Sequence, residues 1–211
     1  MGFVKADWRA FLRRVDELAR SNAAVAPATR TQVCLDIGGG TGPLRQVVTG
    51  HRFRYVNVDM RRISGVDVVA DVHQLPFESG SVDLVVSTNC LEHVTNIWDV
   101  IPEINRVMRP GARFAALVPF LHPFHGDDVA RFTAYGLKRV LEPLSIDDIS
   151  VPTHVVTLIG LIPAAALQRA GWPRMAASVR DCCSVVDTWL TRAGWDFRSW
   201  AHSYLITASK P

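Results

Sequence analysis

Glycines clustered behind an acidic residue form the segment best suited to bind a ligand. The segment spans Asp36–Gly42, at the end of the apolar run Val33–Ile37, and its glycines are Gly38, Gly39, Gly40 and Gly42. Glycine lets the backbone turn sharply and lets a ligand approach the main chain closely. The leading Asp36 would repel a pyrophosphate but can pair with an ammonium group. The alternative is a glycine-rich turn that binds nothing.

The spacing of these glycines separates the segment from a dinucleotide-binding loop. Gly38, Gly40 and Gly42 are each two residues apart, whereas the dinucleotide fingerprint is Gly-x-Gly-x-x-Gly. Pro43 stands where that fingerprint needs its third glycine. The spacing therefore disfavours a nicotinamide-dependent oxidoreductase.

Two more carboxylates follow predicted strands further along the chain. Asp59 follows the predicted strand Phe53–Val58, in which apolar and polar residues alternate, and Asp71 follows the predicted strand Val66–Ala70. A carboxylate at the end of a second strand can accept both hydroxyls of a ribose. Met60 could then lie against an adenine face, and Asp71 could accept from an exocyclic amine. The alternatives are a solvated strand end for Asp59 and the N-cap of a short helix for Asp71.

The elements that position these residues alternate between strands and helices. Strands are predicted at Val33–Ile37, Phe53–Val58, Val66–Ala70, Val82–Ser87 and Arg113–Val118, within Ser145–Val156, and at Ser203–Ser209. Helices are predicted at residues 4–20, Pro43–Thr49, Trp98–Met108 and Ala134–Leu141, with Pro102 tolerable only in a first turn. This alternation predicts an α/β fold with a doubly wound, mostly parallel, seven-stranded sheet. Ligands of such sheets bind beyond the carboxyl ends of the strands.

The order of these motifs resembles class I S-adenosylmethionine-dependent methyltransferases, in their small-molecule branch. Val33–Gly42 is similar to the first motif of that family, and Asp59 and Asp71 match its acidic positions. Ser81–Val94 is similar to the fourth motif, and Glu103–Gly111 to the segment before the fifth strand. The resemblance covers roughly residues 30–120. It is specific for the cofactor and weak for the substrate.

The resemblance implies a role for each matching residue. The Gly38–Gly42 backbone would hold the methionine moiety of S-adenosylmethionine, with Asp36 near its ammonium group. Asp59 would hold the ribose, and Asp71 with the backbone of Val72 would recognise the adenine.

Two further positions near the methyl group follow from the same resemblance. Asn89 would lie near the methionine end or the sulfonium. Gly39 stands where many relatives have cysteine or another small residue, a departure expected to be harmless. Since the sulfonium is already an activated methyl donor, the protein mainly aligns the acceptor, with a general base if the acceptor is a hydroxyl.

Histidines after the fourth and fifth strands are the candidates for that base. His93 follows the fourth strand, while His122–Arg131 resembles a segment that shapes the active site in many bacterial methyltransferases of this branch. His125 is the preferred base, with Asp127 or Asp128 orienting its ring. The residues predicted to contact the substrate are His122, Asp128 and Arg131.

This segment leaves two alternatives open. Arg131 could anchor an acidic substrate or pair with the aspartates before it, and the whole loop could merely cap the following helix. The spacing of His122, His125 and Asp127 is not a known zinc pattern, so no metal is predicted.

Composition limits the partners and the compartment. The formal net charge is +3, without a clustered basic stripe, so no nucleic-acid partner is expected. Four cysteines without metal-ligand spacing fit a reducing cytoplasm. The N-terminus lacks the apolar core of a signal peptide. The longest uncharged apolar run, Val155–Leu167, is too short to span a bilayer, so no transmembrane segment is expected.

The domain organisation has one open element. Residues 1–31 are predicted to be an N-terminal helix and linker, and residues 32–211 the main domain. Residues 157–192 predict two apolar helices, interpreted as a substrate lid with its core, as a dimer surface, or as an interfacial membrane contact. A lipophilic acceptor would suit such a lid. The chain is expected to be a monomer or a homodimer.

The favoured function is methyl transfer to a small molecule. The acceptor is expected to be a hydroxyl oxygen of a secondary metabolite, a sugar or a lipid-linked glycan. One alternative is methylation of RNA or protein, although Ser87–Cys90 stands where an Asn-Pro-Pro-Tyr-like motif would bind an amine. Another alternative is a non-catalytic scaffold that binds S-adenosylmethionine.

Overall fold

A single mixed sheet organises the chain. The computed structural model describes residues 5–25, 29–121, 127–153, 155–193 and 201–211. The strands are β1 (Gln32–Ile37), β2 (Phe53–Asp59), β3 (Val68–Val69), β4 (Val82–Thr88), β5 (Met108–Pro119), β6 (Ser145–Ser150) and β7 (Ser203–Ser209). Their order is β3-β2-β1-β4-β5-β7-β6, and β7 runs antiparallel to both of its neighbours. The doubly wound, mostly parallel, seven-stranded sheet predicted from the sequence is confirmed.

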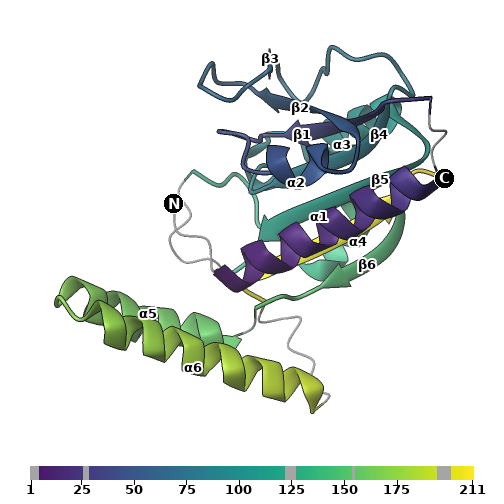
Figure 1. The fold of residues 1–211 in the computed structure, drawn as a ribbon. Helices are drawn as coiled ribbons and strands as arrows, with labels where there is room; N and C mark the ends of the chain where they lie inside the picture. The colour runs from purple at the N-terminus through teal and green to yellow at the C-terminus, as the bar shows by residue number, and fades with distance from the viewer. Residues whose placement is uncertain (1–4, 26–28, 122–126, 154, 194–200) are drawn as a thin grey trace.

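Helices cover both faces of this sheet (Figure 1). The helices that lie against the sheet are α1 (Lys5–Val25), α2 (Arg45–Thr49), α3 (Ile97–Val107) and α4 (Ala134–Val140). A 3-10 turn η1 (Leu91–His93) follows β4, and α5 (Val155–Arg169) and α6 (Pro173–Arg192) lie away from the sheet. α1 and α2 pack on one face, where Phe11, Val15 and Val48 belong to one buried cluster. α3 and α4 pack on the other face. α1 thus contributes directly to the core of the sheet domain.

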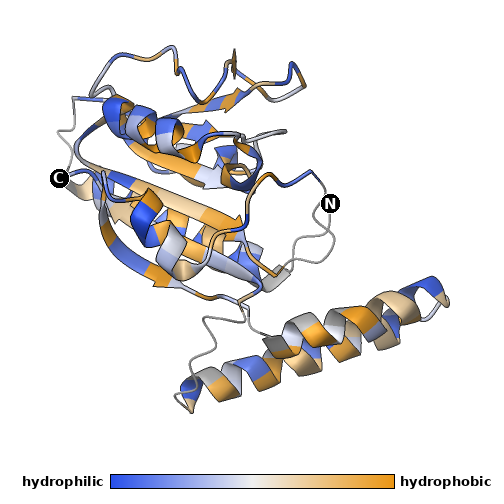
Figure 2. Cartoon of the chain, turned by 180° about the vertical axis from the view of Figure 1, so that it is seen from behind, coloured by the Kyte–Doolittle hydropathy of each residue, from blue (hydrophilic) through white to orange (hydrophobic). Residues whose placement is uncertain are grey.

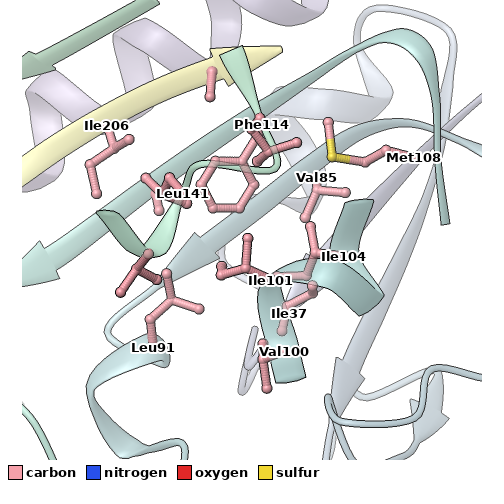
Figure 3. Packing of buried hydrophobic residues seen from close by; sticks show 14 of the residues in the cluster. Ile37, Val85, Leu91, Val100, Ile101, Ile104, Met108, Phe114, Leu141 and Ile206 are labelled. Atoms are coloured by element: carbon pink, nitrogen blue, oxygen red, sulfur yellow. The ribbon is translucent and has the colours of Figure 1, made fainter. Parts of the chain in front are cut away.

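The central strands are mostly apolar because both of their faces are buried. In β4, Leu84 and Val86 face the cluster under α1, whereas Val85 faces the cluster under α3. Figure 3 shows this second cluster, in which Val85 and Phe114 from the sheet lie with Ile101 and Ile104 from α3.

Some predicted elements differ from the structure. The fifth strand was expected over Arg113–Val118, but β5 begins at Met108, directly after α3. The third strand was expected over Val66–Ala70, but β3 pairs with β2 only at Val68–Val69, at the edge of the sheet. The expectation that Pro102 needs a first turn is wrong, since α3 begins at Ile97 and Pro102 lies in its second turn. Pro102 is exposed, so the Trp98 carbonyl that loses its helical partner lies on the solvent side of the helix.

The two apolar helices form a hairpin that stands apart from the sheet (Figures 1 and 2). A side chain at Gly160 of α5 would overlap the Cys183 sulfur, so the helices pack closely there. The buried Asp187 of α6 accepts hydrogen bonds from the backbone N–H groups of Val156 and Thr157, at 3.1 and 2.9 Å. These contacts hold α5 and α6 together. No described helix is both long and apolar enough to cross a membrane.

Candidate active site

The candidate site lies where the strand order changes direction. β1 pairs with β2 on one side and with β4 on the other, so the loops after β1 and β4 diverge at the same edge. Backbone hydrogen bonds fix the start of each loop. The Gly38 N–H donates to Val58 at 2.8 Å, and the Asn89 N–H donates to Leu117 at 3.0 Å. This edge therefore brings together the loops that carry the predicted cofactor residues.

The glycine loop needs its glycines for two physical reasons. Gly38, Gly40 and Gly42 have φ angles of 68°, 53° and 73°. Residues other than glycine rarely adopt this backbone conformation. A Cβ at Gly38 would also lie 2.5 Å from the Cys90 sulfur, which follows β4. In contrast, the space beside Gly40 is open within 4 Å. The loop is thus packed tightly beneath and open at its crest.

Gly39 proves more constrained than the sequence suggested. A Cβ there would overlap the side-chain oxygen of Asn57 and come within 2.6 Å of the Asp36 carboxylate. Glycine at position 39, where many relatives have cysteine or another small residue, was expected to be harmless. In this chain it is required, because position 39 has no room for a side chain.

Asn57 is a structural residue of the loop that the sequence analysis missed. Its buried amide donates to the carbonyl of Gly40 at 2.8 Å and to that of Gly65 at 2.7 Å. Both donors of the amide are therefore used to fix two loops at once. The available signal was a polar amide inside an apolar strand, two residues before Asp59.

Asp36 is buried beneath the loop. It is fully buried, and the Tyr55 hydroxyl donates a hydrogen bond to its Oδ2. Burial raises the pKa of Asp36 to about 7, although the Tyr55 hydrogen bond and the Arg45 charge act in the opposite direction. Burial and the neighbouring Asp36 likewise raise the pKa of Tyr55. Tyr55 is the described hydrogen-bond partner of the Asp36 carboxylate. The contact of Asp36 with an ammonium group stays a prediction.

Asp59 lies at the carboxyl end of β2 with both oxygens engaged. Arg61 donates from Nε to Oδ1 and from a terminal nitrogen to Oδ2, each at 3.1 Å. Burial raises the pKa of Asp59, but the hydrogen bonds from Arg61 outweigh burial, so that the pKa lies below its ordinary value. The carboxylate is therefore ionised and aligned to accept two adjacent donors. Met60, predicted to lie against an adenine, is strongly exposed beside it.

Asp71 follows β3 and forms a turn of its own. Its carboxylate accepts hydrogen bonds from the backbone N–H and the ring Nδ1 of His73, at 2.9 and 2.6 Å. These bonds lower the pKa of Asp71. The residues after it form a turn rather than a helix, so the alternative of a helix N-cap does not apply. Val72 is half-buried beside it.

A second group of ionisable residues joins η1 to the segment after β5. The ring Nδ1 of His93 lies 3.2 Å from the Asp127 carbonyl and 3.4 Å from the Asp128 carboxylate. Arg131 forms an ion pair with Asp128 and donates to the Phe120 carbonyl at 2.8 Å. Of the two alternatives for Arg131, the structure shows the pairing with an aspartate. Asp127, predicted to orient a base, contributes its backbone carbonyl to His93.

Glu92 lies buried at the centre of this group. Its pKa is raised to about 8, first by burial and then by the charge of Asp128. Ligand atoms of Glu92, His93 and Asp128 come within 4.8 Å of one another, which is close enough to surround a cation. The Arg131 guanidinium already balances the Asp128 charge, however, so the group offers little net negative charge to a metal. His122 and His125 lie outside the described residues.

Part of the chain is similar to known methyltransferases. Residues 35–116 match the family model described as a methyltransferase domain. An uncharacterized methyltransferase of Mycolicibacterium gilvum is 34% identical over 141 residues, which is 61% of this chain and 54% of the relative. The chain thus spans about half the length of the curated relatives it matches. Over these residues the chain is therefore similar to methyltransferases, in agreement with the resemblance of its motifs to the class I S-adenosylmethionine-dependent family.

Solved structures support the same methyltransferase fold. A putative sarcosine dimethylglycine methyltransferase from Galdieria sulphuraria has a TM-score of 0.63 at 15% identity, covering 100% of this chain and 91% of that one. A Burkholderia thailandensis 1,6-didemethyltoxoflavin-N1-methyltransferase, solved with S-adenosylhomocysteine, has a TM-score of 0.59 at 17% identity, covering 96% and 80%. The matched methyltransferase domain includes the glycine loop, Asp59, Asp71 and Asn89 but neither Arg131 nor the α5–α6 hairpin.

Proposed function

We propose that this chain binds S-adenosylmethionine and transfers its methyl group to a small molecule. The observation that carries the proposal is Asp59, an ionised carboxylate at the end of β2 that accepts two adjacent donors from one group. Vicinal ribose hydroxyls present two donors in the same way. The residues present therefore fit the ribose of this cofactor.

The surrounding residues fit the rest of the cofactor. The open crest of the loop at Gly40 would hold the methionine moiety against the backbone, and Asn89, with a φ of 48°, begins the facing loop. Asp71 and Val72 would recognise the adenine, with Met60 against its face. When bound, the sulfonium supplies an activated methyl group. The chain's own task is to align an acceptor with it and to exclude water.

The acceptor we propose is a hydroxyl, which needs a base. His93 is the described candidate because Asp128 lies 3.4 Å from its Nδ1 and can hold the ring in one orientation. His125 remains the alternative base, and His122 a substrate contact, both proposed from the sequence. Arg131 anchors Asp128, and through it His93, so we assign Arg131 a positioning role in place of direct substrate binding.

Calorimetry with S-adenosylhomocysteine tests the cofactor site. The purified chain should bind this compound, and Asp59→Ala should weaken binding by about 1.5–3 kcal/mol through the loss of charge-assisted hydrogen bonds. Arg61→Ala should tighten binding, because the guanidinium and the ribose compete for the same two oxygens. The matched control Asp181→Ala removes an exposed carboxylate from α6 and should change nothing.

Two results would count against the proposal. Absence of binding to the unsubstituted chain would remove the cofactor assignment altogether. Equal affinities for Asp59→Ala, Arg61→Ala and Asp181→Ala would show that the ribose lies elsewhere.

A further inference from the structure

The α5–α6 hairpin carries large apolar side chains into solvent. Ile159 and Ile162 of α5 are 62% and 68% exposed, and Val185 and Trp189 of α6 are 68% and 66% exposed. Trp172, between the helices, is also exposed. Burying such side chains is the main source of favourable free energy in protein association. A hairpin that leaves them uncovered is therefore expected to meet another apolar phase.

The exposed apolar residues extend from one side of the hairpin onto its outer surface, where Ile162 and Val185 lie two residues from the contact positions. On α5, exposed Ile159 and Pro163 each come one residue before the buried contact positions Gly160 and Ala164. On α6 the exposed positions likewise come one residue before the contact positions, with Cys182 before Cys183 and Val186 before Asp187. One residue is about 100° of helix. Because the helices are antiparallel, equal offsets in the same direction bring both apolar stripes to the same side.

Arginines end each of these stripes. Arg169 comes seven residues after Ile162, and Arg192 comes three residues after Trp189, spacings that keep each arginine on the face of its stripe. Residues 155–193 contain four arginines and two aspartates, and one of the aspartates is the buried Asp187 that binds the first amides of α5. The exposed surface of the hairpin is therefore apolar and cationic together.

We propose that the α5–α6 hairpin docks the protein on an anionic lipid surface. Apolar stripes that contain tryptophan and end in arginine are the pattern of helices that lie in the membrane interface, with cationic side chains reaching the headgroups. No described helix is long and apolar enough to cross a bilayer, and the proposed docking is to the lipid surface. A second copy of this chain is disfavoured because two such faces would bring arginines together.

The hairpin leaves the sheet at the edge that holds the candidate active site. It is inserted between β6 and β7, and β7 begins beside Pro119 at the carboxyl end of β5. Docking would therefore place this edge near lipid, where a membrane-borne acceptor could be reached. That consequence rests on the proposed function, whereas the docking itself does not.

Vesicle sedimentation tests the docking without any activity measurement. The purified chain is mixed with vesicles of phosphatidylcholine alone or with equal amounts of phosphatidylcholine and phosphatidylglycerol. We expect binding to the mixed vesicles, weaker binding to the neutral ones, and weakening by salt. Trp189→Ala should lower binding at least about tenfold. The matched control Trp98→Ala removes a 58% exposed tryptophan from α3 and should bind like the parent chain.

The outcomes separate the alternatives. Arg192→Gln should weaken binding to the mixed vesicles only, because it removes charge and keeps the apolar stripe. Absence of vesicle binding, or an equal loss in Trp189→Ala and Trp98→Ala, would overturn the proposal. A dimer in sedimentation equilibrium that Trp189→Ala dissociates, without vesicle binding, would assign the face to a second copy. Thermal melts and S-adenosylhomocysteine binding confirm that each variant is folded, and they judge the cofactor site independently.

Discussion

Replacing Asp36 with asparagine should change stability in a way that depends on pH. Asp36 is fully buried under the glycine loop, and burial raises its pKa to about 7 from the ordinary aspartate value of 3.8. Between pH 4 and 7 the folded chain therefore holds a proton that the unfolded chain releases. The free energy of unfolding then falls as the pH rises through this window, because the folded state binds more protons.

The size of the effect follows from the two pKa values. Each unit of difference corresponds to 1.36 kcal/mol, so ionised Asp36 costs roughly 4 kcal/mol above pH 7. Asp36→Asn removes this cost and keeps the shape. Its amide must find acceptors in a buried site, which takes back about 1–3 kcal/mol. We expect the variant to be about 1–3 kcal/mol more stable than the parent chain at pH 8, and no more stable at pH 4.

Urea unfolding at several pH values measures this difference. Glu92 also titrates abnormally, but it is present in both proteins and cancels in the difference between them. Tyr55→Phe is the complementary variant, because it leaves Asp36 without its hydroxyl donor, raises the pKa of Asp36 further and should extend the loss of stability to higher pH. A difference between Asp36→Asn and the parent chain that stays constant from pH 4 to 8 would refute the reasoning.

Two further substitutions test the buried polar groups around the site. Asn57→Ala should lower the free energy of unfolding by about 2–4 kcal/mol, because the carbonyls of Gly40 and Gly65 lose their donors. The same loss should weaken S-adenosylhomocysteine binding. Unchanged urea unfolding curves would contradict this role of Asn57. Glu92→Gln should gain stability relative to the parent chain as the pH rises from about 4.5 to about 8, because burial raises the pKa of Glu92 to about 8 in the folded state. If the variant and the parent chain differ in free energy of unfolding by the same amount at pH 5 and at pH 9, the pKa of Glu92 is not raised in this way.

Local chemistry explains why much of the site could be predicted. The loop glycines were found because positive φ angles select glycine whatever the surroundings. The placement of Asp59 and Asp71 at strand ends could be predicted because the change from apolar to polar residues marks the end of a strand. The buried β4 was found because a strand covered on both faces has no polar side.

The partners of these residues could not be predicted in the same way. Tyr55 meets Asp36 from the neighbouring strand, 19 residues away, and only the register between β1 and β2 brings them together. Arg61 engages Asp59 from the loop after β2, and Arg131 engages Asp128 beside His93. When an arginine lies near an aspartate in the sequence, the sequence does not show whether the two pair in the fold or whether the arginine pairs with another group.

The sequence by itself determined the order of strands and helices and the glycine loop with its flanking carboxylates, because periodicity and backbone conformation are local properties. The tertiary structure alone decided that Asp36 is buried against Tyr55, that Asn57 fixes the loop from below, and that α5 and α6 stand apart with apolar side chains exposed. These features depend on which surfaces are covered after folding, and coverage is set by contacts between residues that are distant in the chain.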